Sequence, residues 1–129
     1  MSTVESILLE KGSDVIGLVD TTTVRIAVGK MIEANVGCLI VEANDRAIGI
    51  FTERDLLRRV VGEGKDPDTT LISEVMTSPV SSCKPSDEVG ECFKTLSASE
   101  FRHLLVLDNE EPVGVISLRD VALVLHRAE

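Results

Sequence analysis

Two stretches of the chain, GIFTERD at residues 49–55 and GVISLRD at residues 114–120, carry the same pattern. In each stretch, glycine is followed by two apolar residues, then by threonine or serine, and three positions later by aspartate. The apolar residues suit a strand, and the hydroxyl residue suits the N-cap of a helix. Each stretch therefore predicts a junction at which a strand ends and a helix begins.

The repetition extends on both sides of these two stretches, which points to an internal duplication. When the sequence is shifted by 65 residues, the two halves align without a gap from Val15 onward, at polar as well as apolar positions. We interpret the chain as two repeats, residues 1–66 and 67–129, with the glycine- and proline-containing residues 62–68 as the connector. The matched pairs include Val15 with Val80, Val24 with Val89, Leu39 with Leu104, Val41 with Val106, Asn44 with Asn109, Gly49 with Gly114, Arg54 with Arg119 and Asp55 with Asp120.

Each repeat is predicted to have the element order β-α-β-β-α. A short extended piece comes first, and a polar capping stretch and apolar residues at helical spacing follow it. Two short strands separated by turn-forming residues predict a hairpin, and a last helix begins at the hydroxyl residue of the motif. The fold class is therefore α+β, with helices against small sheets. The hairpin strands are expected at residues 38–41, 47–51, 104–107 and 113–116, and the opening positions Val4, Ile7 and Leu8 echo Ile72, Val75 and Met76.

The residue types of the motif suit a ligand that carries a ribose and a phosphate. Gly49 and Gly114 permit a close approach to the backbone. The hydroxyl and the first N–H groups of the following helix face an anion at the helix N-terminus. Asp55 and Asp120 lie one turn into the helix, where a carboxylate accepts both hydrogen bonds of a ribose diol, as acidic residues do in nucleotide-binding folds.

The same pattern also has a purely structural interpretation. Threonine or serine followed three residues later by an acidic residue, ahead of an apolar run, is a capping box. In that case Thr52 caps the helix and Asp55 reaches back to its backbone N–H. Duplication of one repeat would copy the cap without any ligand, so the pattern by itself leaves both interpretations open.

Composition excludes several classes of protein. The formal net charge is −9, and the chain has three phenylalanines and no tryptophan or tyrosine, so it lacks the basic clusters and stacking rings of nucleic-acid binders. No apolar run approaches the roughly 20 residues of a membrane helix. The N-terminus does not resemble a signal peptide, so a cytoplasmic location is expected.

Metal and catalytic sites are not indicated either. Cys38, Cys83 and Cys92 form no C-x-x-C pair, and the two histidines, His103 and His126, are 23 residues apart, so the cysteines are expected to be ordinary small apolar residues. The sequence has no recognisable catalytic triad and no Walker-type phosphate loop. We therefore expect no metal and no enzyme activity.

With both motifs in view, the sequence resembles the cystathionine-β-synthase (CBS) domain family. The G-h-h-[ST]-x-x-D pattern, with h apolar, is similar to the nucleotide motif of that family. SEVMTSPV at residues 73–80 resembles the segment that opens a CBS repeat, and FRHLLVLD at residues 101–108 resembles its central strand, although the family often has proline where Leu105 stands. The likeness spans nearly the whole chain; the opening of the first repeat, VESIL at residues 4–8, is looser.

The resemblance implies a stand-alone, Bateman-type tandem module rather than an enzyme. It implies two repeats packed about a pseudo-two-fold axis, with clefts that bind AMP, ATP, NAD, S-adenosylmethionine or a related adenosyl compound, AMP or ATP being expected first. It also implies a homodimer and leaves an effector protein unidentified. A scaffold for dimerisation with empty clefts is the alternative that the sequence leaves open.

Site residues follow from the resemblance, position by position. Asp55 and Asp120 are expected to bind ribose, and Thr52 and Ser117 to contact ribose or phosphate. Arg102 and His103 in the second repeat match Gly37 and Cys38 in the first, so the two clefts are expected to be unequal. Asp55 and Thr52 are expected to share one cleft with Arg102 and His103, which are candidate phosphate contacts, so this cleft is expected to favour a phosphorylated ligand. Asp120 and Ser117 are expected to share the other cleft with Gly37 and Cys38, which offer no charge. The full set adds Arg54 and Arg119 for phosphate, Gly49 and Gly114 in the motif, and Ile16, Gly17, Leu18, Ile50 and Val115 beside the base.

Overall fold

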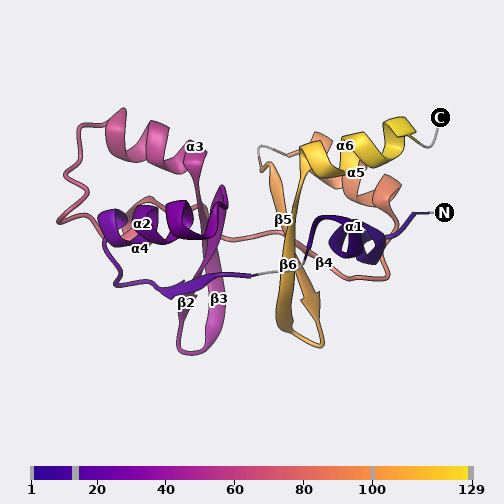
Figure 1. Ribbon diagram of the computed structural model, residues 1–129, viewed down its shortest axis with the longest axis horizontal. Helices are drawn as coiled ribbons and strands as arrows, with labels where there is room; N and C mark the ends of the chain where they lie inside the picture. The colour runs from indigo at the N-terminus through magenta and orange to yellow at the C-terminus, as the bar shows by residue number, and fades with distance from the viewer. Residues whose placement is uncertain (1, 13–14, 100, 128–129) are drawn as a thin grey trace. The chain divides into compact units, whose positions relative to one another are not determined.

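The computed structural model describes residues 2–12, 15–99 and 101–127 of the 129-residue chain. Its contacts divide the chain into two compact units. One unit comprises residues 16–80 and is called the middle unit here; the other comprises residues 1–15 and 81–129 and is called the terminal unit. Each unit has a three-stranded mixed sheet with helices packed beside it (Figure 1), which confirms the predicted α+β class.

The middle unit is built on a sheet of order β1-β2-β3. Strand β1 runs parallel to β2, and β2 pairs with β3 as an antiparallel hairpin. The helix that follows β3 starts as a single α-turn and continues as a π-helix. The elements are β1 Gly17–Val19, α2 Val24–Ala34, β2 Cys38–Ala43, β3 Arg46–Thr52, α3 Glu53–Asp55, the π-helix η1 Leu56–Val61 and α4 Ile72–Val75.

The terminal unit repeats this arrangement with the order β4-β5-β6. Strand β4 is parallel to β5, and β5 and β6 form the hairpin. Its last helix is α-helical throughout. The elements are α1 Val4–Lys11, β4 Ser82–Cys83, α5 Val89–Ser97, β5 His103–Asp108, β6 Glu111–Ser117 and α6 Leu118–Arg127.

Two-residue turns close both hairpins. Asn44 and Asp45 have φ of 52° and 61°, and Asn109 and Glu110 have φ of 52° and 67°. Two left-handed residues in succession twist in the sense of the flanking strands, and Asn and Asp tolerate that conformation. The turns were predicted, but the strands extend further toward them than expected, and β6 includes Pro112. Proline is accommodated because β6 lies at the sheet edge, where one face of the strand backbone needs no partner.

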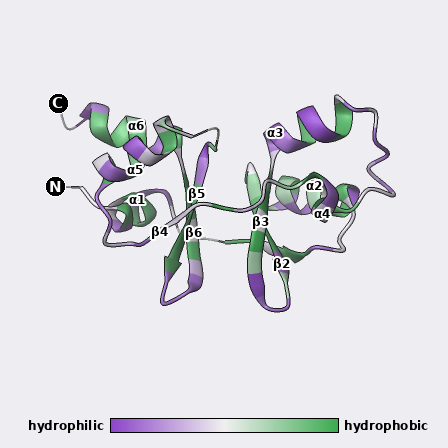
Figure 2. Cartoon of the chain, turned by 180° about the vertical axis from the view of Figure 1, so that it is seen from behind, coloured by the Kyte–Doolittle hydropathy of each residue, from purple (hydrophilic) through white to green (hydrophobic). Residues whose placement is uncertain are grey.

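Each unit buries its own apolar core. In the middle unit Phe51 and Val41 of the hairpin pack with Val24 of α2 and Val60 of η1. In the terminal unit the corresponding hairpin packs with α5, α6 and α1. The strands are hydrophobic in their middles and the hairpin tips are hydrophilic (Figure 2), as expected for sheets that bury one face against helices.

The opening segments of the two sequence repeats are exchanged between the units. Helix α1, which begins the first repeat, contributes Val4, Ile7 and Leu8 to the core of the terminal unit. Helix α4, which begins the second repeat, contributes Ile72 and Val75 to the core of the middle unit. The compact units therefore run 16–80 and 81–129 with 1–15, although the sequence repeats divide the chain at residues 66 and 67.

None of the helices within the described ranges is long and apolar enough to cross a membrane.

Candidate functional site

Both motif stretches lie where the third strand of a sheet meets the helix that follows it, α3 after β3 and α6 after β6. At the end of β3, the Asp55 backbone N–H donates to Thr52 Oγ1 at 3.1 Å, and the Thr52 N–H donates to Asp55 Oδ2 at 3.0 Å. At the end of β6, Asp120 N–H and Ser117 N–H make the same reciprocal bonds at 3.0 and 2.9 Å. The capping box is thus present at both junctions. A ligand role for the aspartates depends on what else surrounds each carboxylate.

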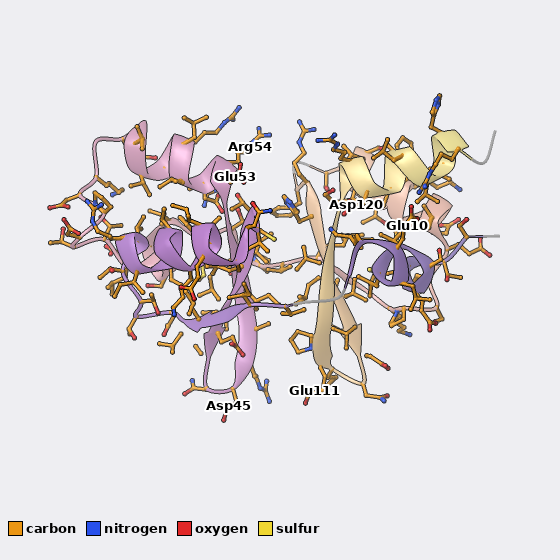
Figure 3. The ribbon with its side chains drawn as sticks, viewed as in Figure 1. Glu10, Asp45, Glu53, Arg54, Glu111 and Asp120 are labelled. Carbon is orange, nitrogen blue, oxygen red and sulfur yellow. The ribbon has the colours of Figure 1, made fainter. Side chains whose placement is uncertain are left out.

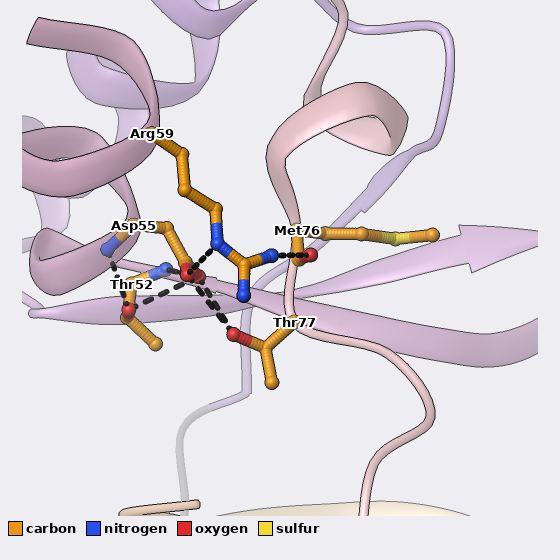
Figure 4. A network of polar contacts seen from close by, with 5 residues as sticks. All are labelled: Thr52, Asp55, Arg59, Met76 and Thr77. Atoms are coloured by element: carbon orange, nitrogen blue, oxygen red, sulfur yellow. Dashed lines mark hydrogen bonds and ion pairs between the residues drawn. The ribbon is translucent and has the colours of Figure 1, made fainter. Parts of the chain in front are cut away.

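Asp55 lies in a closed polar network (Figure 4). Asp55 is only 5% exposed. The hydroxyl of Thr77 donates to Oδ1 and Oδ2 at 3.0 and 3.2 Å, and the hydroxyl of Thr52 donates to Oδ2 at 3.1 Å. Arg59 Nε lies 3.7 Å from Oδ1, and its guanidinium also donates to the Met76 carbonyl at 2.6 Å. Both carboxylate oxygens are therefore occupied by groups of the middle unit.

The backbone holds Thr77 in place beside Asp55. Ile50 and Thr77 form an isolated antiparallel bridge, in which Thr77 N–H donates to the Ile50 carbonyl at 2.8 Å and Ile50 N–H donates to the Thr77 carbonyl at 3.0 Å. The segment after α4 is thus attached to β3 by main-chain bonds. The hydroxyl of Thr77 is presented to Asp55 by this pairing.

Asp120 is more accessible, with a side chain that is 22% exposed. Its principal partner is Lys11 at the end of α1, whose Nζ lies 2.7 Å from Oδ2 and donates to the Val115 carbonyl at 3.2 Å. Burial raises the pKa of Asp120, but the hydrogen bonds from Lys11 and Ser117 outweigh burial and hold the pKa below its ordinary value. The bonds from Lys11 and Ser117 both fall on Oδ2.

Other segments of the chain pack closely against the two motif glycines, Gly49 and Gly114. A Cβ added at Gly49 would lie 2.8 Å from the Thr77 backbone oxygen and 2.7 Å from Met76 Sδ. At Gly114 the added Cβ would lie 2.6 Å from Leu8 Cδ2. The packing of the exchanged opening segments accounts for both glycines, whether or not a ligand approaches the backbone there.

The structure places Arg102 and His103 beside the motif junction of the terminal unit. In the terminal unit His103 pairs with Ser117, and Leu118 N–H donates to the Arg102 carbonyl at 2.9 Å. In the middle unit Cys38 pairs with Thr52 in the corresponding way. Arg102 and His103 therefore lie beside the Ser117 end of β6 within their own unit. Their predicted sharing of a cleft with Asp55 joins residues of different units and stays a prediction.

The exposure of the candidates varies. Arg54, beside Glu53 at the start of α3, is exposed (Figure 3), and Arg119 is exposed at the start of α6. Ile50 is buried at 3% exposure, whereas its counterpart Val115 is half-buried. Ile16 and Leu18 are half-buried against the middle core, and Gly17 between them is exposed on β1.

Among the described residues, Lys11, Arg59 and Thr77 contact the motif aspartates although they lie outside the predicted set. Thr77 lies in the segment that resembles the opening of a CBS repeat. Its hydroxyl is a hydrogen-bond donor, and this was the sequence feature that could have pointed to a contact with Asp55. Lys11 lies in the opening of the first repeat, where the alignment between repeats is interrupted, so no counterpart pointed to it.

The cysteines are buried or half-buried, as expected for small apolar side chains. Cys83 and Cys92 belong to the core of the terminal unit. Burial, together with the neighbouring Cys92, raises the pKa of Cys83 to about 12, so this thiol stays protonated near neutral pH. No group of histidine, cysteine and acidic side chains suited to a metal ion occurs in the described ranges.

Comparisons with known proteins agree with the resemblance seen in the sequence. The family model for the CBS domain matches residues 5–62 and 72–127. An uncharacterised protein of Methanopyrus kandleri is 39% identical over 78% of this chain and 52% of its own length. The chain spans 22% of a CBS-domain protein of Arabidopsis thaliana, so it matches only part of these curated relatives.

Solved structures match over nearly the whole chain. A protein with CBS domains from Burkholderia ambifaria is 32% identical, with a TM-score of 0.88 and coverage of 99% of this chain and 96% of the other. A CBS-domain protein of Pyrobaculum aerophilum, solved in complex with AMP, is 26% identical, with a TM-score of 0.81 and coverage of 98% of both chains. The arrangement of sheets and helices described above is therefore that of a pair of CBS domains.

Proposed function

The chain belongs to the CBS-domain family, and from that membership we propose that it is a ligand-sensing module that binds an adenine nucleotide or a related adenosyl compound. CBS domains are typically regulatory modules, and no catalytic family is indicated for this chain. The proposal includes the absence of an enzyme activity of its own. A cytoplasmic location stays a prediction from the sequence.

One observation carries the proposal: the same hydroxyl and carboxylate pair stands at the same strand-to-helix junction in both units. A carboxylate can accept hydrogen bonds from ribose hydroxyl groups, as an acidic residue does in other nucleotide-binding folds. The similar protein from Pyrobaculum aerophilum was crystallised with AMP, which supports an adenosyl ligand. AMP and ATP are the first candidates, and S-adenosylmethionine and NAD share the adenosine that the motif would recognise.

The alternative is a scaffold that binds no small molecule and serves to bring chains together. Two observations favour it. The capping boxes give both aspartates a structural role, and Leu57 and Val61 on η1 of the middle unit are 64% and 66% exposed. Exposed apolar residues one helical turn apart suit an interface. We propose a homodimer under either alternative.

A direct experiment separates a ligand-binding module from a scaffold. The purified full chain is denatured, and the released small molecules are identified by mass spectrometry. The chain is then titrated by calorimetry with AMP, ATP, S-adenosylmethionine and adenosine. Saturable binding of at least one adenosyl compound is expected, with no turnover of the bound nucleotide; inosine or guanosine nucleotides serve as controls. Absence of binding to all four compounds would favour the scaffold.

A further inference from the structure

The two motif aspartates make the same capping bonds but have different second donors. In the middle unit the donor is the hydroxyl of Thr77, and in the terminal unit it is the ammonium of Lys11. The backbone carbonyls beside them also correspond, because Ile50 and Val115 match in the 65-residue alignment. Thr77 N–H donates to the first carbonyl and Lys11 Nζ to the second. In the terminal unit the side chain of Lys11 therefore takes the place that the main-chain bridge between Ile50 and Thr77 has in the middle unit.

The Asp55 junction is closed to an incoming ligand. A ribose diol would have to displace the Thr77 hydroxyl, whose position is fixed by two backbone bonds to Ile50. It would also have to separate Asp55 from Arg59, which is itself bonded to the Met76 carbonyl. At 5% exposure, the carboxylate can be reached only after the segment that follows α4 has moved.

The Asp120 junction needs no such movement. The Lys11 side chain is 42% exposed and joins Asp120 through its terminal ammonium alone. Helix α1 stays attached without that contact, because Leu8 is buried in the core and Glu10 pairs with Arg127 at 2.7 Å. The four-carbon stem of lysine is flexible and its ammonium is well solvated, so the ammonium can leave while the backbone remains in place.

We propose that the Asp120 junction is the adenosyl site that exchanges its ligand, and that Lys11 is a displaceable internal occupant of that site, whereas Thr77 keeps the Asp55 junction closed. This inference rests on the proposed binding of an adenosyl compound. It assigns one exchangeable site to each chain. It also gives a function to a residue that lies outside the predicted site.

Displacement of Lys11 determines which adenosyl ligands are favoured. When the ribose hydroxyls donate hydrogen bonds to the carboxylate of Asp120, the ammonium of Lys11 loses its anionic partner. The 5′-phosphate of a nucleotide lies several ångströms from the diol, within the sweep of a lysine side chain anchored at the end of α1. An ammonium binds phosphate by a charge-assisted hydrogen bond. The site should therefore prefer AMP over adenosine, which offers no second anion.

The first test is the number and location of binding sites on the full chain. Calorimetric titration with AMP should give one equivalent per chain. Asp120→Asn should weaken AMP binding about ten- to a hundredfold, the usual effect of removing a charged hydrogen-bond partner. Its melting temperature is recorded alongside, so that loss of binding is not confused with loss of fold.

The second test uses Lys11→Met, which keeps the stem and removes the charge. Adenosine should bind about two- to fivefold more tightly, because an exposed ion pair of this kind no longer competes. The preference for AMP over adenosine should fall about tenfold, because the phosphate contact is lost. Loss of the competitor affects both ligands equally, so the ratio isolates the phosphate contact. Lys94→Met, on the exposed face of α5 in the same unit, is the charge-matched control and should leave both affinities unchanged.

The outcomes separate this inference from the proposed function. Two equivalents of AMP per chain, unchanged AMP affinity in Asp120→Asn, or an unchanged AMP-to-adenosine ratio in Lys11→Met would overturn the inference while leaving an adenosyl-binding module. No binding of AMP, ATP, S-adenosylmethionine or adenosine to the wild-type chain and to Lys11→Met would overturn both. Adenosine binding that appears only in Lys11→Met would support the internal occupant directly.

Discussion

Lys11 and Thr77 make corresponding contacts in the two units, each donating to the carbonyl that follows the motif glycine and to the motif aspartate. Lys11 does so with a single ammonium, and Thr77 with its main-chain N–H and its hydroxyl. The pseudo-symmetry of the chain is therefore preserved in hydrogen bonding at a pair of positions where the residue types have diverged.

Asp55 should act mainly as a structural residue. Asp55→Ala removes the capping contact and leaves the hydroxyl of Thr77 and the guanidinium of Arg59 without their acceptor. We expect a loss of about 2–4 kcal/mol in the free energy of unfolding, from a lost cap and from buried hydrogen bonds. Urea denaturation at neutral pH measures it.

Glu33→Ala, on the exposed face of α2, is the control for removal of an acidic side chain and should change the stability by less than about 0.5 kcal/mol. A change at Asp55 no larger than the change at Glu33 would show that the network in Figure 4 does not stabilise the middle unit.

The pKa of Asp120 should respond to the removal of Lys11. In the wild-type chain the hydrogen bonds from Lys11 and Ser117 keep it below the ordinary value of 3.8 despite burial. In Lys11→Met burial is no longer offset by the ammonium, so the pKa should rise. Titration of the aspartate carboxyl carbons by NMR measures both values.

The lowered pKa of Asp120 makes the stability of the fold depend on pH. A carboxyl whose pKa is lower in the folded than in the unfolded chain stabilises the fold fully above its unfolded pKa, and this contribution is lost as the pH falls through the folded pKa. Lys11→Met should therefore be less stable than wild type at pH 6, and the two should converge in acid. A difference that is constant from pH 6 to pH 2 would contradict the assignment to Asp120.

The two motif glycines should differ in their tolerance of alanine. At Gly49 the added methyl group meets Met76 Sδ and a main-chain oxygen of Thr77, which is held in the bridge to β3, whereas at Gly114 the nearest atoms that it meets are side-chain atoms, those of Leu8. We expect Gly49→Ala to cost about 1–3 kcal/mol, in the range of overpacked sites, and Gly114→Ala to cost less. Thermal denaturation of both variants gives the order, and equal costs would contradict it.

The homodimer can be tested at the exposed turn of η1. Static light scattering on the wild-type chain should give twice the chain mass of 13.9 kDa. Replacement of Leu57 and Val61 together by Asp should shift the protein to monomer, since charges oppose burial of that face. Leu9→Asp, an 81% exposed apolar position on α1, is the comparison variant. A wild-type chain that stays monomeric at high micromolar concentration would refute the dimer.

The local parts of the fold could be predicted because their signals are local. Asn44 and Asp45 between two apolar runs predicted a hairpin, and the residues that turn and pair lie within a few positions of one another. The capping pairs were predicted for the same reason. The strands run further than predicted, because a two-residue turn lets both strands continue into residues that are not apolar, as at Pro112.

The parts that were missed depend on long-range contacts. Val4, Ile7 and Leu8 form the same pattern whichever core they join, so the sequence does not say that α1 belongs with β6. Lys11 meets Asp120 only because of that exchange, across 109 residues of chain. The π-helix was also not predicted, because its wider hydrogen-bond register has no signature in the apolar spacing of residues 56–61.

The exchanged opening segments make each half of the gene product dependent on the other. A fragment of residues 1–66 carries α1 but lacks α4, and residues 67–129 carry α4 but lack α1, so neither fragment contains a complete hydrophobic core. Chain cleavage in the connector would leave two pieces that complete each other by trading helices. The two fragments should therefore complement each other. Co-expressed residues 1–66 and 67–129 should form a folded pair, whereas either fragment alone should be degraded.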